Sequence, residues 1–304
     1  MKPTWKHWVE YALLRLVAAM LGPLGIRRAG AIGARLALIG YWPLRIRRGV
    51  VTRHINACFP DRSEGERGAL VRETYAHLGR VGLESILMSR LGPESMHALF
   101  ERVDGWDMLE RARAQGKGLV LVAGHLGNWE LSGAYLSTLG VPVAAVAKRQ
   151  LNPLADAFVN RTRRRLGMTV VYDDEAVRRL PRLLKDGFGL GLLADQAGLG
   201  AATFVPFFGR PARTPRGPAV FALRFGAPLI YVVAARQPSG KYVLHLEEVD
   251  VARTGDLEAD VDVTTARFTA VLERWVRRYP GQYLWAHRRW KRQPPDTPPE
   301  LREP

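Results

Sequence analysis

The sequence predicts an α/β fold with a largely parallel central sheet flanked by helices, preceded by an N-terminal membrane-associated helix. Two observations support this fold class. Beyond residue 100, short apolar runs alternate with longer segments of helical spacing, an alternation typical of strand–helix–strand units. Before residue 45 the chain is largely apolar, with tryptophans and arginines at the borders of its apolar stretch, a pattern typical of a membrane interface.

Residues 1–45 are expected to form the membrane-associated segment. The stretch 8–24 is apolar, but charged residues, a glycine and a proline interrupt it. It therefore falls short of the unbroken run of about 20 residues that crosses a bilayer. Tryptophans precede the stretch, and Arg27 and Arg28 follow it, which favours a helix lying in an anionic interface. A helix packed on the rest of the protein is the alternative.

Residues 46–292 are expected to form one domain. It begins with a long helix at 64–91, and strands and helices alternate after it. The expected strands are 118–123, 142–147, 169–172, 188–194, 228–234 and 242–249. The expected helices are 104–115, 128–139, 153–166, 175–186, 216–226 and 262–279. The remaining tail, 293–304, is rich in proline and charge, so we expect it to be frayed.

Composition limits the classes of function. The chain has 304 residues, and Lys and Arg exceed Asp and Glu by 16, so it should attract polyanions such as nucleic acid, anionic lipid or an acidic carrier protein. Cys58 is the only cysteine, which excludes an intrachain disulfide and a cysteine-ligated zinc site. Neither a phosphate-binding Gly-Lys-Ser/Thr loop nor the Gly-x-Ser-x-Gly elbow of serine hydrolases occurs.

The most informative segment is Gly-His-Leu-Gly-Asn-Trp-Glu at 124–130. His125 follows an expected strand and precedes an expected helix, where ligands bind in α/β proteins. Asn128 is a good helix N-cap. We expect Glu130 to fold back toward His125, fix its tautomer and make it a general base. A loop histidine beside a solvated acid is the alternative interpretation.

Three further segments carry candidate site residues. Asn-Pro at 152–153 is followed by several arginines, of which Arg163 projects from a different helix face than Arg161 and Arg165. Asp195 ends an expected strand and should point into the crevice at the sheet edge.

The third of these segments, 204–217, joins an aromatic cluster to a turn that begins a helix. Its aromatic residues could line a groove for an apolar ligand or pack in the core, and Arg216 could help to bind an anion there.

These segments resemble, in the same order along the chain, the motifs of the bacterial lipid A biosynthesis acyltransferases, within the lysophospholipid acyltransferase superfamily. The His-x4-Asp/Glu motif at 125–130, the Phe-Val-Pro-Phe-Phe-Gly element at 204–209 and the Trp-x-His-Arg-Arg-x-Lys element at 285–291 carry the likeness. We interpret the last element as structural or interfacial.

The resemblance implies a membrane-associated enzyme on the cytoplasmic face of the inner membrane. It would move an acyl chain from acyl-carrier protein, or from acyl-CoA, to a hydroxyl of a lipid A precursor, with no cofactor, no metal and no nucleic acid partner. His125 and Glu130 would be catalytic. Asn128, Arg163, Asp195 and Arg216 would bind substrate.

Two other functions remain open at this stage. The first is acylation of another glycolipid or aminolipid, such as a phosphatidylinositol mannoside. The second is a basic membrane-binding protein without catalysis, which would leave the pairing of His125 with Glu130 unexplained.

Overall fold

The computed structural model describes residues 2–196 and 200–304. Asp195 is therefore described, whereas Ala197 and Gly198, which follow it in the sequence, lie outside the described residues.

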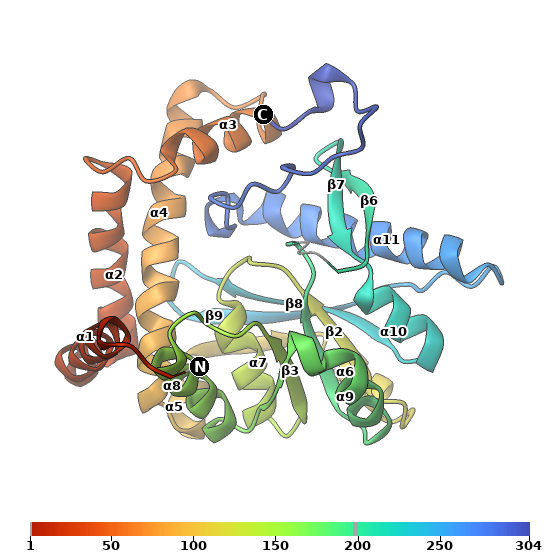
Figure 1. Cartoon of the computed structure of the whole chain (residues 1–304), viewed down its shortest axis with the longest axis horizontal. Coiled ribbons are helices and arrows are strands. Elements are labelled where there is room, and N and C mark those ends of the chain that lie inside the picture. The colour runs from red at the N-terminus through yellow and green to blue at the C-terminus, as the bar shows by residue number, and fades with distance from the viewer. Residues whose placement is uncertain (1, 197–199) are drawn as a thin grey trace.

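A seven-stranded sheet forms the centre of the protein, in the order β1-β9-β8-β2-β5-β3-β4 (Figure 1). The strands are β1 (Phe100–Asp104), β2 (Leu119–Ala123), β3 (Val143–Ala147), β4 (Thr169–Tyr172), β5 (Gly189–Leu193), β8 (Leu229–Arg236) and β9 (Tyr242–Glu248). Five neighbours, from β8 to β4, run parallel; β9 is antiparallel to β8, and β1 pairs with β9. The predicted α/β class with a largely parallel sheet is confirmed.

Helices cover both faces of this sheet. They are α3 (Arg48–Cys58), α4 (Glu64–Leu87), α5 (Pro93–His97), α6 (Trp106–Arg113), α7 (Trp129–Thr138), α8 (Pro153–Arg165), α9 (Asp173–Lys185), α10 (Gly217–Phe225) and α11 (Leu257–Arg278). Alternate residues of β2 belong to two core clusters. Val120 and Val122 pack in the cluster that includes α10 and α11, and Leu119 and Leu121 pack in the cluster that includes α6 and α7.

The register of the central strands brings two loops to one edge of the sheet. In the parallel pairing of β2 with β5, Ala123 lies opposite Leu193. Each strand is followed, two residues later, by a candidate site residue: His125 after β2 and Asp195 after β5. Because the strands are neighbours, their carboxyl ends place these two residues side by side.

The N-terminal segment forms α1 (Trp5–Leu21) and α2 (Gly25–Tyr41), joined by one short turn. By length and composition, the stretch Trp5–Tyr41 could cross a membrane, and little of it is buried in the protein, so it is a candidate membrane anchor. Helix α2 packs closely along α4. A Cβ on Gly79 of α4 would lie 2.2 Å from the carbonyl oxygen of Gly33, so only glycine allows this approach.

Three features differ from the sequence-based expectations. Strand β1 was not expected, and neither was the two-stranded hairpin of β6 (Ala202–Phe207) and β7 (Arg210–Pro215). Phe207 and Phe208 of this hairpin are buried in the core, which favours packing over an acyl groove. The C-terminal tail is not frayed: its residues contact α3 and β7, for example through hydrogen bonds from Arg210 to backbone oxygens of the tail.

Candidate active site

His125 pairs with Asp195 at the carboxyl edge of the sheet. The Nδ1 atom of the His125 ring lies 2.7 Å from Oδ1 of Asp195, and the backbone N–H of His125 donates to Oδ2 over 2.8 Å. Asp195 is 1% exposed. The other ring nitrogen, Nε2, has no hydrogen-bond partner among the described residues, and the His125 side chain is 18% exposed. The pair therefore fixes one tautomer and leaves Nε2 able to accept a proton.

Glu130 does not make the hydrogen bond that we expected it to make with His125. Its two carboxylate oxygens accept from Nε and Nη2 of Arg163, over 3.0 and 2.5 Å, in a bidentate ion pair. The expectation that Glu130 orients the ring is corrected: in this structure Asp195 does so, and Glu130 acts on His125 only as a nearby negative charge.

The cap of α7 explains this arrangement. The Asn128 side chain accepts from the N–H of Leu131, so the helix begins at Trp129 and directs Glu130 away from the His125 ring. The amide nitrogen of Asn128 donates to the buried carboxylate of Glu84 on α4. Asn128 is fully buried, and both its polar atoms bond to the protein. The expected helix cap is confirmed, but this geometry does not support substrate binding by Asn128.

Burial and charge act in opposite directions on His125. Burial lowers the pKa of its imidazole, but the Asp195 carboxylate, helped slightly by Glu130, outweighs burial, so that the pKa lies above its ordinary value. For Asp195, burial raises the pKa, whereas His125 and the positive charge of Arg289 lower it below its ordinary value. Asp195 is therefore ionised at neutral pH, and it favours a protonated imidazole.

Arg289 is a buried cation behind Asp195 that sequence reasoning missed. It is 5% exposed; its Nη1 and Nη2 donate to the Arg213 carbonyl oxygen and to the Thr214 hydroxyl, both over 2.6 Å. Its charge helps to hold Asp195 ionised. The interpretation of the element 285–291 as structural fits the burial and hydrogen bonds of Arg289, to which the structure adds an electrostatic effect on Asp195. The sequence signal for the burial of Arg289 was its position between Trp285 and Trp290, two residues that are buried in the core.

The loop that carries His125 is held by the same C-terminal segment. The N–H of Leu284 donates to the His125 carbonyl over 3.0 Å, and the N–H of Gly127 donates to the Gln282 carbonyl over 3.0 Å. Gly127 has a φ of 62°. A Cβ there would lie 2.0 Å from the Ala234 carbonyl of β8, so the loop packs against the strand only because this residue is glycine.

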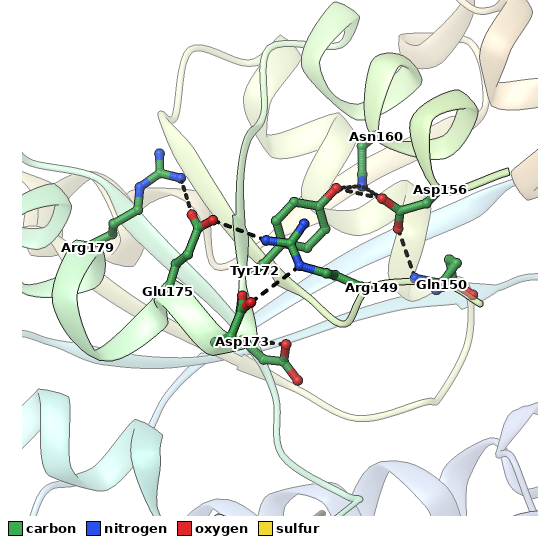
Figure 2. A network of polar contacts seen from close by, with 9 residues as sticks. Arg149, Gln150, Asp156, Asn160, Tyr172, Asp173, Glu175 and Arg179 are labelled. Carbon is green, nitrogen blue, oxygen red and sulfur yellow. Dashed lines mark hydrogen bonds and ion pairs between the residues drawn. The ribbon is translucent and has the colours of Figure 1, made fainter. Parts of the chain in front are cut away.

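A polar network on α8 supports Arg163. Its Nη1 donates to Oδ1 of Asn160 over 2.9 Å. Asn160 in turn donates to Asp156 and to the Tyr172 hydroxyl, which also donates to Asp156 (Figure 2). Arg149 stacks over the Tyr172 ring, 3.7 Å from its centroid. The guanidinium that meets Glu130 is thus held by a chain of satisfied polar contacts.

The N-cap of α8 also contacts helix α1 of the N-terminal segment. Asn152 caps α8 through its side-chain oxygen, and its nitrogen donates to the His7 carbonyl and to Glu10, both over 2.9 Å. This contact links α1 directly to α8, the helix whose Arg163 pairs with Glu130.

An apolar cavity of about 80 Å³ lies beside this ion pair, between α7 and the sheet. Glu130, Arg163 and Trp129 are among its lining residues, and the Trp129 ring also contacts His125, with 4.9 Å between the ring centroids. Most of the rest of the lining is aliphatic or glycine: Leu121, Ala123, Gly133, Leu136, Val143, Ala145, Val146, Gly191, Leu192, Leu193 and Val232. A second, outer cleft of about 420 Å³ shares the same three residues. The Glu130–Arg163 pair therefore lies between an open cleft and an apolar interior.

No contact among the described residues brings Arg216 to this group. Its Nη2 donates to Glu258 over 2.6 Å, and Asp262 of the same helix lies 3.9 Å away. Its charge is thus already paired within the protein, which does not support the expected role in substrate binding. Cys58 is buried, and burial raises the pKa of its thiol, as for an inert core cysteine.

Comparison with known proteins shows which family the chain belongs to. The model of the family described as bacterial lipid A biosynthesis acyltransferase matches residues 1–292. The lipid A biosynthesis lauroyltransferase of Escherichia coli is 29% identical, over 97% of this chain and 94% of the relative. The palmitoleoyltransferase of the same organism is 28% identical, over 95% and 92%. A phosphatidylinositol mannoside acyltransferase of Mycolicibacterium smegmatis is 29% identical, over 91% and 88%.

Proposed function

Because the chain belongs to the bacterial lipid A biosynthesis acyltransferase family, we propose that this acyltransferase moves a fatty acyl chain from an acyl-carrier protein thioester to a hydroxyl of a lipid A precursor. The observation that carries the proposal is the buried His125–Asp195 pair, whose imidazole has a free Nε2 and contacts Trp129, a lining residue of the apolar cavity. A base next to an apolar pocket suits a reaction that joins a polar hydroxyl to an apolar chain.

The reaction is a direct acyl transfer. Nε2 of His125 removes the proton from the acceptor hydroxyl, and Asp195 stabilises the imidazolium that forms. The hydroxyl oxygen attacks the thioester carbonyl carbon and gives a tetrahedral oxyanion. When this collapses, the carbon–sulfur bond breaks, and the imidazolium returns the proton to the leaving thiolate. The steps balance without a metal or a redox cofactor.

The acyl chain enters the cavity between α7 and the sheet. The Glu130–Arg163 pair lines both this cavity and the outer cleft, so a chain that enters from the cleft passes the only charged residues among the described residues of the cavity lining. We assign Arg163 to contacts with the thioester carbonyl or a polar part of the substrate, because a guanidinium held by Asn160 is preorganised to donate hydrogen bonds.

The positive surface supports both macromolecular partners of the proposed reaction. A net charge of +16 attracts an acidic carrier protein and an anionic membrane. With α1 and α2 at the lipid, the protein works on the cytoplasmic face of the inner membrane, where acyl-carrier protein is available. Acyl-CoA is the alternative donor.

Mass spectrometry of lipid A tests this function. Cells that lack the protein should accumulate a lipid A precursor that is short of one acyl chain. Expression of the wild-type protein, but not of the His125→Ala variant, should restore the missing acyl chain. His97→Ala, an exposed histidine away from the site, is the matched control. An unchanged lipid A profile, with the missing acyl group found instead on another glycolipid such as a phosphatidylinositol mannoside, would reject lipid A as the acceptor.

A further inference from the structure

A second cluster of charge lies at the turn between β8 and β9, away from the His125–Asp195 pair. Arg27 of α2 and Arg236 at the end of β8 both reach Gly240 of this turn. Their Nη2 atoms each lie 3.1 Å from the position that a Cβ on Gly240 would take, so the two guanidiniums are at most about 6 Å apart. Arg80 of α4 is close enough to Arg236 for their charges to interact. Three elements thus bring three arginines together.

No carboxylate of the described residues forms a salt bridge with these arginines, and the Glu84 carboxylate acts on Arg80 and Arg236 only through its charge at longer range. None of the three forms an ion pair with any residue in the described ranges 2–196 and 200–304. Arg27 donates only to the Ser239 carbonyl, over 2.7 Å, and the Nε atom of Arg236 is buried without a hydrogen-bond partner. Arg80 and Arg236 are partly buried and Arg27 is exposed, and like charges repel one another at this range. A bound anion would remove that cost.

A cavity of about 340 Å³ adjoins the cluster. Arg80 and Arg236 line it together with Glu73, Ala76, His77, Gln237, Pro238, Tyr279 and Gln282. Its one carboxyl, on Glu73, packs against Gly281 and pairs with neither arginine. The nearby Glu84 carboxylate is already bonded to Asn128 and Tyr242.

We propose that Arg27, Arg80 and Arg236 form a binding site for the phosphate group of a membrane lipid. The planar guanidinium matches pairs of phosphate oxygens, and three of them can neutralise a phosphate from three directions. The lipid source follows from Arg27, because it belongs to α2, whose apolar length makes it a candidate membrane anchor. The bound phosphate joins α2, α4 and the β8–β9 turn.

This site is separate from the proposed reaction and does not depend on it. The loop contacts of Gly127 with Gln282 and His77 lie between the cavity and His125. A phosphate bound at the three arginines would therefore position the protein on its membrane without touching the reacting atoms.

Binding measurements with full-length protein in neutral detergent test the proposal. Thermal unfolding is followed with inorganic phosphate, against chloride at equal ionic strength, and flotation is followed with vesicles of phosphatidylcholine with and without phosphatidic acid. Arg80→Gln and Arg236→Gln should each weaken binding to the phosphatidic acid vesicles at least tenfold. Arg35→Gln and Arg72→Gln, exposed on the same two helices, should leave it within about twofold, because they remove the same charge elsewhere.

The stability of the variants adds an independent measure. Without phosphate, Arg236→Gln should melt no lower than wild type, because it relieves the repulsion, and phosphate should stabilise wild type but not the variant. Equal losses of vesicle binding in all four variants would show a diffuse positive surface and overturn the proposal. Stabilisation by free phosphate, with unchanged vesicle binding in the Arg80 and Arg236 variants, would overturn the lipid assignment.

Discussion

Replacing Asp195 by asparagine separates the roles of the two carboxylates near His125. The carboxamide keeps the size of the side chain but loses the charge, and it can no longer accept two hydrogen bonds through two anionic oxygens. In the structure these bonds measure 2.7 and 2.8 Å, and only the one to Nδ1 strengthens when the ring takes up a proton.

The expected loss follows from that bond. A hydrogen bond to a charged group contributes about 1.5–3 kcal/mol, and about 1.4 kcal/mol corresponds to a factor of ten in rate. A carboxamide can also hold the wrong tautomer, which in serine proteases costs about 10⁴. We therefore expect kcat to fall by about 10²–10⁴ in Asp195→Asn, with the protein still folded.

The pH profile gives the second readout. The negative charge of Asp195 is what raises the pKa of His125 against the effect of burial. Without it the pKa of His125 falls, so the neutral base persists to lower pH, and the acid limb of the kcat/KM profile should move to lower pH. Measurement requires steady-state kinetics with acyl-carrier thioester across the pH range.

A matched control exists elsewhere in the sheet. Asp104 lies 3.0 Å from Nδ1 of His245 at the β1–β9 edge, so Asp104→Asn makes the same chemical change in a similar pair outside the candidate site. It should leave both kcat and the pH profile unchanged. If Asp195→Asn keeps activity within threefold while Glu130→Gln abolishes it, then Glu130 orients the base and our assignment is wrong.

Four other substitutions have defined outcomes. Arg163→Lys should lower kcat at least about tenfold because lysine cannot form the bidentate pair with the α7 carboxylate, whereas Arg164→Lys should change it little; the assay is kinetics at fixed ionic strength. Gly191→Ala fits the backbone, with the nearest atom 3.5 Å from its Cβ, but it narrows the acyl cavity, so competition between thioesters should show a shift toward shorter chains. Gly79→Val should lower the free energy of unfolding by about 1–3 kcal/mol or more, measured in denaturant, because its Cβ meets the backbone of α2. Arg289→Met should lower kcat at least about tenfold and move the acid limb to higher pH in a variant whose near-UV spectrum is native, because it removes a positive charge that opposes protonation of the His125–Asp195 pair; an unmoved limb would make Arg289 purely structural.

The order of elements could be predicted from the sequence because apolar runs and helix signals repeat in it. The strand at 118–123 and the helix at 128–139 lie within one residue of β2 and α7 at every boundary. Strand β1 escaped prediction because its residues, Phe-Glu-Arg-Val-Asp, are mostly polar, as suits an edge strand.

Partners across the sheet could not be predicted from spacing alone. Asp195 and His125 were each placed correctly at a strand end, but their contact depends on β2 and β5 being neighbours, which the sequence order does not reveal. Glu130 was assigned to His125 because it is near in sequence. The direction of a first-turn helix residue overrides that proximity, and Arg163, more than thirty residues away, is the partner instead.

The hydrogen bonds that hold the His125 loop to the C-terminal segment have a consequence for folding during synthesis. The residues that close the loop, 282–289, leave the ribosome roughly 160 residues after His125. Helices α1 and α2 emerge first, and most of the sheet follows, before the buried guanidinium reaches the neighbourhood of Asp195. Since long-range contacts form after local ones, the His125 loop proposed to carry the base is not held in place until synthesis has passed this segment. On the proposed mechanism, acyl transfer is therefore coupled to completion of the fold, and we expect a product that ends before residue 282 to be inactive.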